Sequence, residues 1–430
     1  MSKKILLIAF FLLFVSTSKS QQWKIWNTTN SNIPSDNLSC LILDSNGIIW
    51  IGSGAGLIKF NGTNFTVYDT SNSPMKSNSV WGIDKDKFNN LWISTIRVEG
   101  QSASALMKFD RVNNWSFYNT QNSGISNDNQ WCVKVDTNNI VWSGHNELNK
   151  FNGASWYIYD STNSPLEYSA IREIFVDRQN NKWMENIFFG LYKLTNDTSW
   201  KIYTPNNSGL LGGLIPKIRE DNFGNMWISV NGGINKFDPV KNEWQSWTPE
   251  NSNIISYYPW GLCISRNNTK WIGFGNNAPL SEFNDTTFIP HFAPVSTGAP
   301  QPNIWDIKED KYGNLWLATK SGLMEFNKNG IVGISNQTSI VPDNFKIEKI
   351  YPNPFNPTTK IEFSIYKSSK VAVKIYDIMG KEIETLTDIN YSQGNYEITW
   401  NAKNFSSGIY FVTFYINDNF FESRKILFVR

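Results

Sequence analysis

A tryptophan recurs through most of this chain at intervals of 41 to 50 residues, and it limits the folds that the chain can adopt. Each copy lies in a short motif such as "GIIWIGSGAGLIKFNG" (47–62) or "GNLWLATKSGLMEFNK" (313–328). A fixed period of this length indicates an architecture built from one repeated unit. The anchoring tryptophans number seven: Trp50, Trp92, Trp142, Trp183, Trp227, Trp271 and Trp316.

Each copy predicts four strands. The first is an apolar strand that ends in an Asp/Asn/Gly turn, and the anchoring tryptophan begins the second. The third has an apolar–x–Lys/Glu–Phe pattern, as in Leu57 to Phe60, and the fourth carries two aromatic residues three apart, such as Phe65 and Tyr68. Four antiparallel strands in about 44 residues are typical of a propeller blade. We therefore predict an all-β, seven-bladed β-propeller over residues 21–332, with the anchors packed between blades.

The seventh copy has no convincing fourth strand after Phe326. Near the start of the chain, "QQWKIWNTTNSN" (21–32) carries Trp23 and Trp26 at the spacing of a fourth strand, followed by the Asn–Ser pair that comes after the other fourth strands. This pattern predicts that residues 22–27 complete the last blade and close the ring.

The copies resemble two-component regulator propeller repeats, with their pattern of Asp, Gly-Asn, Trp and Gly-Leu, over residues 22–328. The resemblance is weaker around Trp183 and Trp271. It implies the propeller fold. In that family such propellers often form the periplasmic sensing part of hybrid histidine kinases, a role that we do not carry over because no kinase or receiver sequence occurs in this chain.

The first residues predict a secretory signal peptide over 1–20. Lys3 and Lys4 precede an apolar stretch from Ile5 to Val15, and Ser18 and Ser20 suit a cleavage before Gln21. A retained membrane anchor is the alternative. No other segment is apolar enough to span a membrane, so none is expected after removal of the signal.

A second domain is predicted over 347–430, after a linker at 333–346. Its alternating apolar runs, among them Lys360 to Ile365 and Val371 to Ile375, predict a small immunoglobulin-like β-sandwich. The motif "YPNPF" (351–355), the run "VKIYD" (373–377) and "SGIY" (407–410) resemble the type A C-terminal sorting domain of the type IX secretion system. The resemblance implies export across a Bacteroidota-type envelope, with that machinery as partner of residues 347–430. A generic immunoglobulin-like module is the alternative.

No catalytic, metal or cofactor site is predicted. His145 and His291 have no ligand spacing, and we expect His145 in a solvated loop. The recurring aspartates (Asp44, Asp86, Asp136 and their equivalents) are interpreted as hairpin residues. Cys40, Cys132 and Cys263 are expected to be buried. The net charge of +2 gives no case for nucleic-acid binding.

One group of residues suggests a ligand site. Eleven residues before the anchor, at the start of each innermost strand, four of the seven copies carry a tryptophan: Trp81, Trp131, Trp260 and Trp305. These side chains are predicted to rim the mouth of the central channel and to stack on rings of a ligand, with Arg172 and Tyr168 adding polar contacts. Packing between blades is the alternative for these tryptophans.

These features together predict a protein that is secreted through the periplasm or held at the outer cell surface. Its expected role is non-catalytic binding or display, with a glycan or a surface protein as ligand. Two alternatives stay open. One is a secreted carbohydrate-active enzyme, a propeller lyase or hydrolase, and the other is a structural adhesin.

Overall fold

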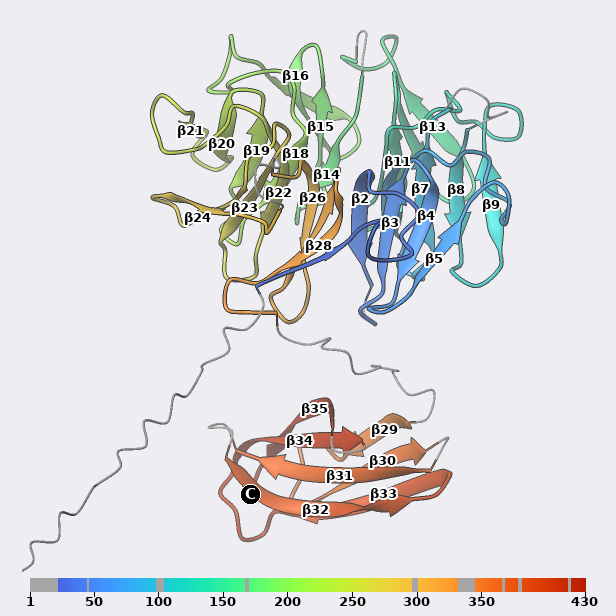
Figure 1. Cartoon of the computed structure of the whole chain (residues 1–430), viewed down its shortest axis with the longest axis vertical. Helices are drawn as coiled ribbons and strands as arrows, with labels where there is room; N and C mark the ends of the chain where they lie inside the picture. The colour runs from blue at the N-terminus through green and yellow to red at the C-terminus, as the bar shows by residue number, and fades with distance from the viewer. Residues whose placement is uncertain are drawn as a thin grey trace, which may run out of the picture. The chain divides into compact units, whose positions relative to one another are not determined.

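A computed structural model describes residues 22–44, 46–97, 104–166, 170–295, 301–331, 345–365, 368–377, 381–416 and 419–430. The chain divides into two compact units, with the boundary between residues 335 and 336. The predicted signal peptide 1–20, residue Tyr168 and residues 333–344 of the predicted linker lie outside the described residues. Every helix or strand element in these ranges is a β-strand (Figure 1).

The first unit contains seven four-stranded sheets, as the sequence predicts. The first sheet consists of β2 (Leu38–Leu43), β3 (Ile49–Ser53), β4 (Gly56–Phe60) and β5 (Phe65–Tyr68). The second consists of β6 (Val80–Lys85), β7 (Leu91–Thr95), β8 (Leu106–Phe109) and β9 (Trp115–Tyr118). The third consists of β10 (Cys132–Val135), β11 (Val141–Gly144), β12 (Leu148–Phe151) and β13 (Trp156–Tyr159).

The fourth sheet consists of β14 (Ile174–Val176), β15 (Lys182–Asn186), β16 (Gly190–Thr195) and β17 (Ser199–Tyr203). The fifth consists of β18 (Lys217–Glu220), β19 (Met226–Val230), β20 (Gly233–Asp238) and β21 (Glu243–Trp247). The sixth consists of β22 (Pro259–Ile264), β23 (Lys270–Phe274), β24 (Leu280–Phe283) and β25 (Phe288–His291). The seventh is β26 (Ile304–Glu309), β27 (Leu315–Thr319), β28 (Gly322–Phe326) and, from the start of the chain, β1 (Trp23–Trp26).

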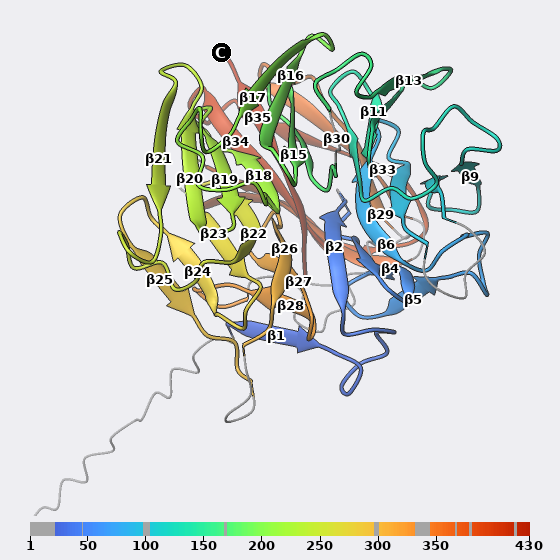
Figure 2. The same cartoon turned by 90° about the horizontal axis from the view of Figure 1, so that it is seen from above.

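The seven sheets are blades around a common axis (Figure 2). The first strand of each blade lies innermost, and each contacts the first strand of the next blade around the full circle, including β26 against β2. The fourth strands lie at the periphery. The fold is therefore a seven-bladed propeller, which confirms the predicted fold class.

The strand β1 occupies the fourth position of the last blade. It pairs antiparallel with β28, so that Trp23 lies opposite Phe326 and Trp26 lies opposite Leu323. Gly322 has φ +104°, and a Cβ there would lie 2.1 Å from the Trp26 carbonyl oxygen. Gly56 and the carbonyl of Tyr68 stand in the same relation within the first blade. The N-terminal strand thus reproduces the geometry of an ordinary fourth strand and closes the ring.

Aromatic contacts hold neighbouring blades together. The anchoring tryptophan of a blade meets the third-strand phenylalanine of the next blade edge to face, with ring centroids 5.7–6.0 Å apart at the closing seams Trp271–Phe326 and Trp316–Phe60. The same contact joins four further pairs: Trp50–Phe109, Trp92–Phe151, Trp183–Phe237 and Trp227–Phe283. Only the seam after the third blade differs, because Leu194 replaces the phenylalanine.

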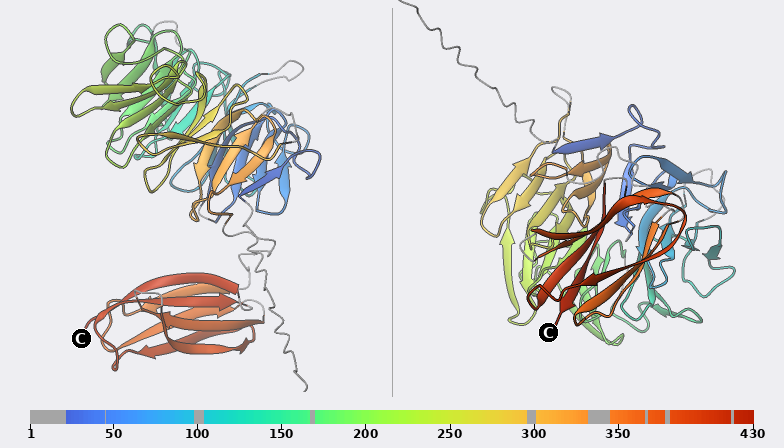
Figure 3. Two further views of the ribbon diagram at one scale, coloured as in Figure 1. Left: turned by 60° about the vertical axis from the view of Figure 1, so that its left-hand side comes forward. Right: turned by 90° about the horizontal axis from the view of Figure 1, so that it is seen from below.

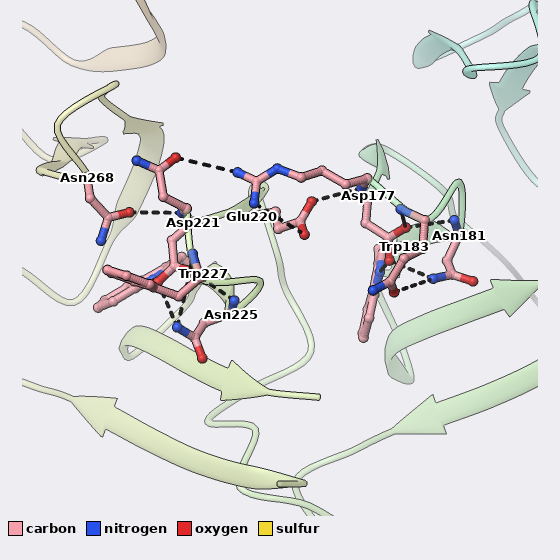
Figure 4. A network of polar contacts seen from close by, with 12 residues as sticks. Asp177, Asn181, Trp183, Glu220, Asp221, Asn225, Trp227 and Asn268 are labelled. Atoms are coloured by element: carbon pink, nitrogen blue, oxygen red, sulfur yellow. Dashed lines mark hydrogen bonds and ion pairs between the residues drawn. The ribbon is translucent and has the colours of Figure 1, made fainter. Parts of the chain in front are cut away.

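The recurring aspartates build the first hairpin in six of the seven blades, as predicted, and Ser265 takes this position in the sixth. In the fifth blade, one carboxylate oxygen of Asp221 accepts the backbone N–H groups of Phe223 and Asn225, and the other accepts the indole N–H of Trp227 at 2.9 Å. Asp177 and Trp183 repeat the arrangement at 2.8 Å (Figure 4). Hydrogen bonds from one hairpin tip to the next, such as Asn222 to Asn268, link the blades at this end.

The second unit consists of two sheets. One is β29 (Phe345–Tyr351), β30 (Thr358–Ile365) and β33 (Gly394–Asn401), and the other is β32 (Glu382–Tyr391), β31 (Ser369–Tyr376), β34 (Gly408–Ile416) and β35 (Asn419–Phe428). The two sheets lie face to face (Figure 3). Both contribute to one core, as in a sandwich, with Phe363, Val373, Trp400 and Phe414 among the buried side chains. The sequence predicts about six or seven strands here, but the apolar runs that we identified do not include β29 or β32. The first of these begins two residues before the predicted start of the domain.

The "YPNPF" motif has a clear structural role in this unit. Phe355 is buried and exchanges backbone hydrogen bonds with Leu427 and Val429 in and just after β35. The side-chain amide of Asn353 accepts the Leu427 N–H and donates to the Lys425 carbonyl. The motif therefore fastens the last strand of the chain to the rest of the domain.

The closing strand should contribute strongly to stability. Trp26 is 9% exposed and stacks on Trp316 at 5.5 Å. Trp26→Ala should therefore lower the free energy of unfolding by about 3–5 kcal/mol, as expected for deleting a buried aromatic side chain. Denaturation followed by tryptophan fluorescence will measure the change, because only Trp400 of the 19 tryptophans lies in the second unit. Thr66→Ala, at an exposed position of the fourth strand β5, is the matched control. Equal stability of the two variants would contradict the closure.

Candidate functional site

The candidate site lies at one end of the propeller axis. All blades have the same strand order, so their first strands run in the same direction and begin at the same end. We call the seven side chains at these starting points the axial rim: Ser39, Trp81, Trp131, Arg172, Pro216, Trp260 and Trp305. Contacts across the seams between blades confirm that they are neighbours, for example the 2.6 Å hydrogen bond from the Ser39 hydroxyl to the Val80 carbonyl.

The four rim tryptophans differ in what covers them. Trp81 is the most open, at 44% exposure, and its indole N–H donates to Ser79. Trp260 and Trp305, from neighbouring blades, meet edge to face at 4.6 Å. They are partly exposed, unlike the buried anchors, so packing between blades describes this pair only in part.

Trp131 contacts the rim residue Arg172 and, from its own blade, His145. The Arg172 guanidinium lies over its ring, 5.1 Å from the centroid, and the His145 ring lies 4.3 Å away. Arg172 itself is exposed. The interpretation of His145 as a solvated loop residue was wrong: the residue is half-buried, and burial lowers the pKa of its imidazole. The structure thus brings Trp131 and Arg172 together, while Tyr168 lies outside the described residues.

Below the rim, charged side chains from three blades meet at the axis. Arg219 of β18 binds Glu173, just before β14, at 2.8 Å and reaches Asp306 of β26 at 3.5 Å. Lys217 pairs with Glu173 at 3.3 Å, and Lys308 pairs with Asp306 at 2.7 Å. These five residues, the axial ion cluster, connect the fourth, fifth and seventh blades through the interior.

The axial ion cluster holds its carboxylates in the charged form. Burial alone would raise the pKa of Asp306, but Lys308, Lys217 and Arg219 outweigh it and hold the pKa well below its usual range. The second oxygen of Asp306 accepts the Leu41 backbone N–H of the first blade at 3.1 Å. Asp306 therefore also fastens the seam where the ring closes.

Glu185 is the residue at this end that the sequence analysis missed. It stands two residues after the anchor, where other blades carry a small residue such as Gly52, Ser94 or Ala318. One carboxylate oxygen accepts the Ile215 N–H at 2.8 Å, and the other has no hydrogen-bond partner. Burial raises the pKa of Glu185 to about 8, with the charge of Arg172 acting in the opposite direction. A carboxylate at a small-residue position was the signal available in the sequence.

The remaining candidates are structural. His291 replaces the second fourth-strand aromatic in the sixth blade, and its ring contacts Trp271 and Phe326. Cys40, Cys132 and Cys263 are free and buried in first strands, as expected, and burial raises the pKa of Cys40 and of Cys263 to about 11. Within the described ranges, no set of three or more His, Cys, Asp or Glu side chains is placed to hold a metal ion, and no helix is long and apolar enough to cross a membrane.

A polar cavity of about 320 Å³ adjoins the rim between the second and third blades. Its lining includes Arg97, Ser126, Asp128 and Asn129. The side chain of Asn129, two residues before Trp131, accepts the Arg97 N–H at 2.6 Å. The axial end of the propeller therefore offers aromatic, cationic and hydrogen-bonding groups together.

Comparison with family models identifies both parts of the chain. The secretion system C-terminal sorting domain matches residues 349–429, and the two-component regulator propeller matches residues 32–55 and 298–321. The chain thus carries two-component regulator propeller repeats followed by a C-terminal sorting domain of the type IX secretion system. The sorting domain implies recognition by that system and, with it, secretion or attachment at the outer surface.

Solved structures show the same fold at low identity. The extracellular domain of a hybrid two-component system from B. thetaiotaomicron matches with TM-score 0.57 and 17% identity, covering 95% of this chain and 57% of that one. Virginiamycin B lyase from Staphylococcus aureus matches with TM-score 0.57 and 12% identity, covering 71% of this chain and 98% of that one. YCF48 bound to D1 peptide matches with TM-score 0.53 and 14% identity, covering 71% and 97%.

The chain spans little more than half of the first of these structures, and at such identities the likeness establishes the fold alone. No curated protein matches the chain.

The axial ion cluster should be important for stability. Arg219→Met should lower the free energy of unfolding by about 3–5 kcal/mol, because it leaves buried carboxylates short of a partner. Arg266, 61% exposed and paired with Glu309, is the matched control. Arg266→Met should cost less than about 1 kcal/mol. Urea denaturation of both variants will measure the difference, and similar costs would argue against a supporting role for the cluster.

Stability of the propeller should fall as the pH rises from 5 to 9. The pKa values of Glu185 and of Glu325, a second buried carboxyl, are raised to about 8, first of all by burial. A raised pKa contributes stability that is fully present below the unfolded-state value and is lost as the pH rises through the folded-state value. The double variant Glu185→Gln/Glu325→Gln should reduce this pH-dependent loss of unfolding free energy, by on the order of a few kcal/mol.

Unfolding free energies at pH 5.5 and 8.5 measure this slope. Glu243→Gln, at an exposed position of β21, should leave it unchanged. A slope that persists in the double variant would show that other groups cause it.

Proposed function

We propose that the propeller is a non-catalytic binding or display module of a secreted or surface-held protein, and that its ligand, a glycan or a surface protein, binds at the axial rim. The sorting domain supplies export. The single observation that supports the rim as the site is the gathering of partly exposed tryptophans at one end of the axis, with Trp81 at 44% exposure. Exposed aromatic side chains with nearby polar groups are typical of binding sites.

The charged groups at the axis favour a binding role over a catalytic one. The carboxylates Glu173 and Asp306 are both engaged in ion pairs at 3.5 Å or less. The two histidines lie in different blades, and His291 is part of a peripheral strand. General acid–base catalysis needs titratable groups within reach of one substrate, and the axial carboxylates are instead committed to holding the blades.

One observation favours a second candidate, a carbohydrate-active lyase or hydrolase. Glu185 has an oxygen without a partner and a pKa of about 8, so its carboxyl carries a proton near neutral pH. A carboxyl in that state can act as a general acid. A substrate would have to reach a side chain that is 1% exposed, which makes this candidate the weaker of the two.

A glycan array probed with the chain lacking the predicted signal peptide tests the binding role. Trp81→Ala and Trp260→Ala should each weaken binding about 3- to 10-fold, the range of one stacking contact. Phe223→Ala is the control, because Phe223 is 81% exposed on the hairpin tip of the fifth blade, at the other end of the axis.

Three outcomes separate the candidates. Binding that survives both tryptophan changes would place the ligand away from the rim. Turnover of a polysaccharide panel, lost in Glu185→Gln, would replace binding by catalysis as the function. Failure to bind any glycan, together with capture of an outer-surface protein that depends on the propeller, would favour the adhesin.

A further inference from the structure

An exposed cationic side chain lies over the ring of each of two rim tryptophans. The Arg172 guanidinium lies over Trp131 of the preceding blade, and the Lys320 ammonium lies 5.6 Å from the ring centroid of Trp305. Both cations are exposed, and neither forms an ion pair among the described residues. An aromatic face restricts a cation that would otherwise move freely, because the ring quadrupole attracts it. The N–H groups of Arg172 are thus held at the rim, with no ion-pair partner in the part of the chain that the structure describes.

Beneath the rim, positively charged side chains outnumber negatively charged ones. The axial ion cluster contains three cations, Lys217, Arg219 and Lys308, against the two carboxylates Glu173 and Asp306. Glu185 adds little negative charge below pH 8. Among the described residues, Glu147 lies beside His145, and the cavity lining adds one further carboxylate, Asp128, together with one further cation, Arg97. Since the whole chain has a net charge of only +2, the excess of positive charge at the rim is a local feature.

We propose that the axial rim binds an acidic polysaccharide whose sugar rings carry carboxylates, a polyuronate. This inference rests on the proposed function and specifies its ligand. Arg172 binds a carboxylate of the sugar through its planar fork of N–H donors, the geometry that suits bidentate recognition. Trp81, whose ring is the most open, stacks on a sugar ring, and Lys320 binds a further carboxylate along the polymer. Trp131 is a positioning residue, because it holds the Arg172 guanidinium in place.

A pair of polymers that differ only in charge tests the proposal. Polygalacturonate should bind the chain lacking the predicted signal peptide, and its methyl-esterified form should bind at least 10-fold more weakly. Arg172→Gln should weaken polygalacturonate binding about 10-fold or more, as expected for the loss of a charge-assisted bidentate contact. Arg172→Lys should retain part of the affinity, because it keeps the charge without the fork. Trp131→Ala should weaken binding of the acidic polymer and leave weak binding of the esterified form unchanged.

Lys241→Gln is the matched control, because Lys241 is 66% exposed and lies on a peripheral turn. Equal effects of Arg172→Gln and Lys241→Gln would overturn the proposal, and so would equal binding of the two polymers. Dextran sulfate that competes as well as polygalacturonate would show a general anion site and would overturn the choice of carboxylate. Binding of neutral glycans that depends on Trp81 but not on Arg172 would contradict this inference alone, whereas absence of any glycan binding would contradict glycan binding at the rim as a whole.

Discussion

The propeller depends on the contact between the anchoring tryptophan of one blade and the third-strand phenylalanine of the next. A four-stranded blade has two apolar faces and cannot bury both by itself. The edge-to-face contact, at about 6 Å in each seam that has it, joins one blade to the next at a fixed angle. The aspartate that accepts the indole N–H of five anchors fixes the ring at the centre of this contact. Repetition of this contact from blade to blade closes the ring and places the first strands around one axis, where the rim lies.

What the sequence predicts well is whatever repeats. Trp227, Asp221 and the strand spacing were visible because each has counterparts in other blades, and the partner of Trp23 could be found because the last copy lacked a strand. The axial ion cluster could not be predicted, because Arg219 and Asp306 belong to blades five and seven and meet only through the curvature of the assembled blades. The role of Arg172 over Trp131 likewise depends on the angle between two blades.

Several residues of the proposed site stand at positions that break the repeat. A repeated position supports the fold and tends to carry the same residue in every blade, whereas a ligand needs different groups at different places. Glu185 replaces a small residue, Arg172 stands where four blades carry tryptophan, and His145 packs beneath a rim ring. These three departures lie in the third and fourth blades, so the rim is asymmetric although the scaffold is nearly symmetric.

The pairing of β1 with β28 also determines when the fold can be completed. Trp23 and Phe326 are separated by most of the propeller sequence, and contacts between such distant segments form late because the intervening loop must first be ordered. Six blades can assemble as the chain is made, but the seventh must wait for its own strands and for the strand made first. The ring can therefore close only after β28 has been made, and the rim acquires its final shape only after the two ends meet.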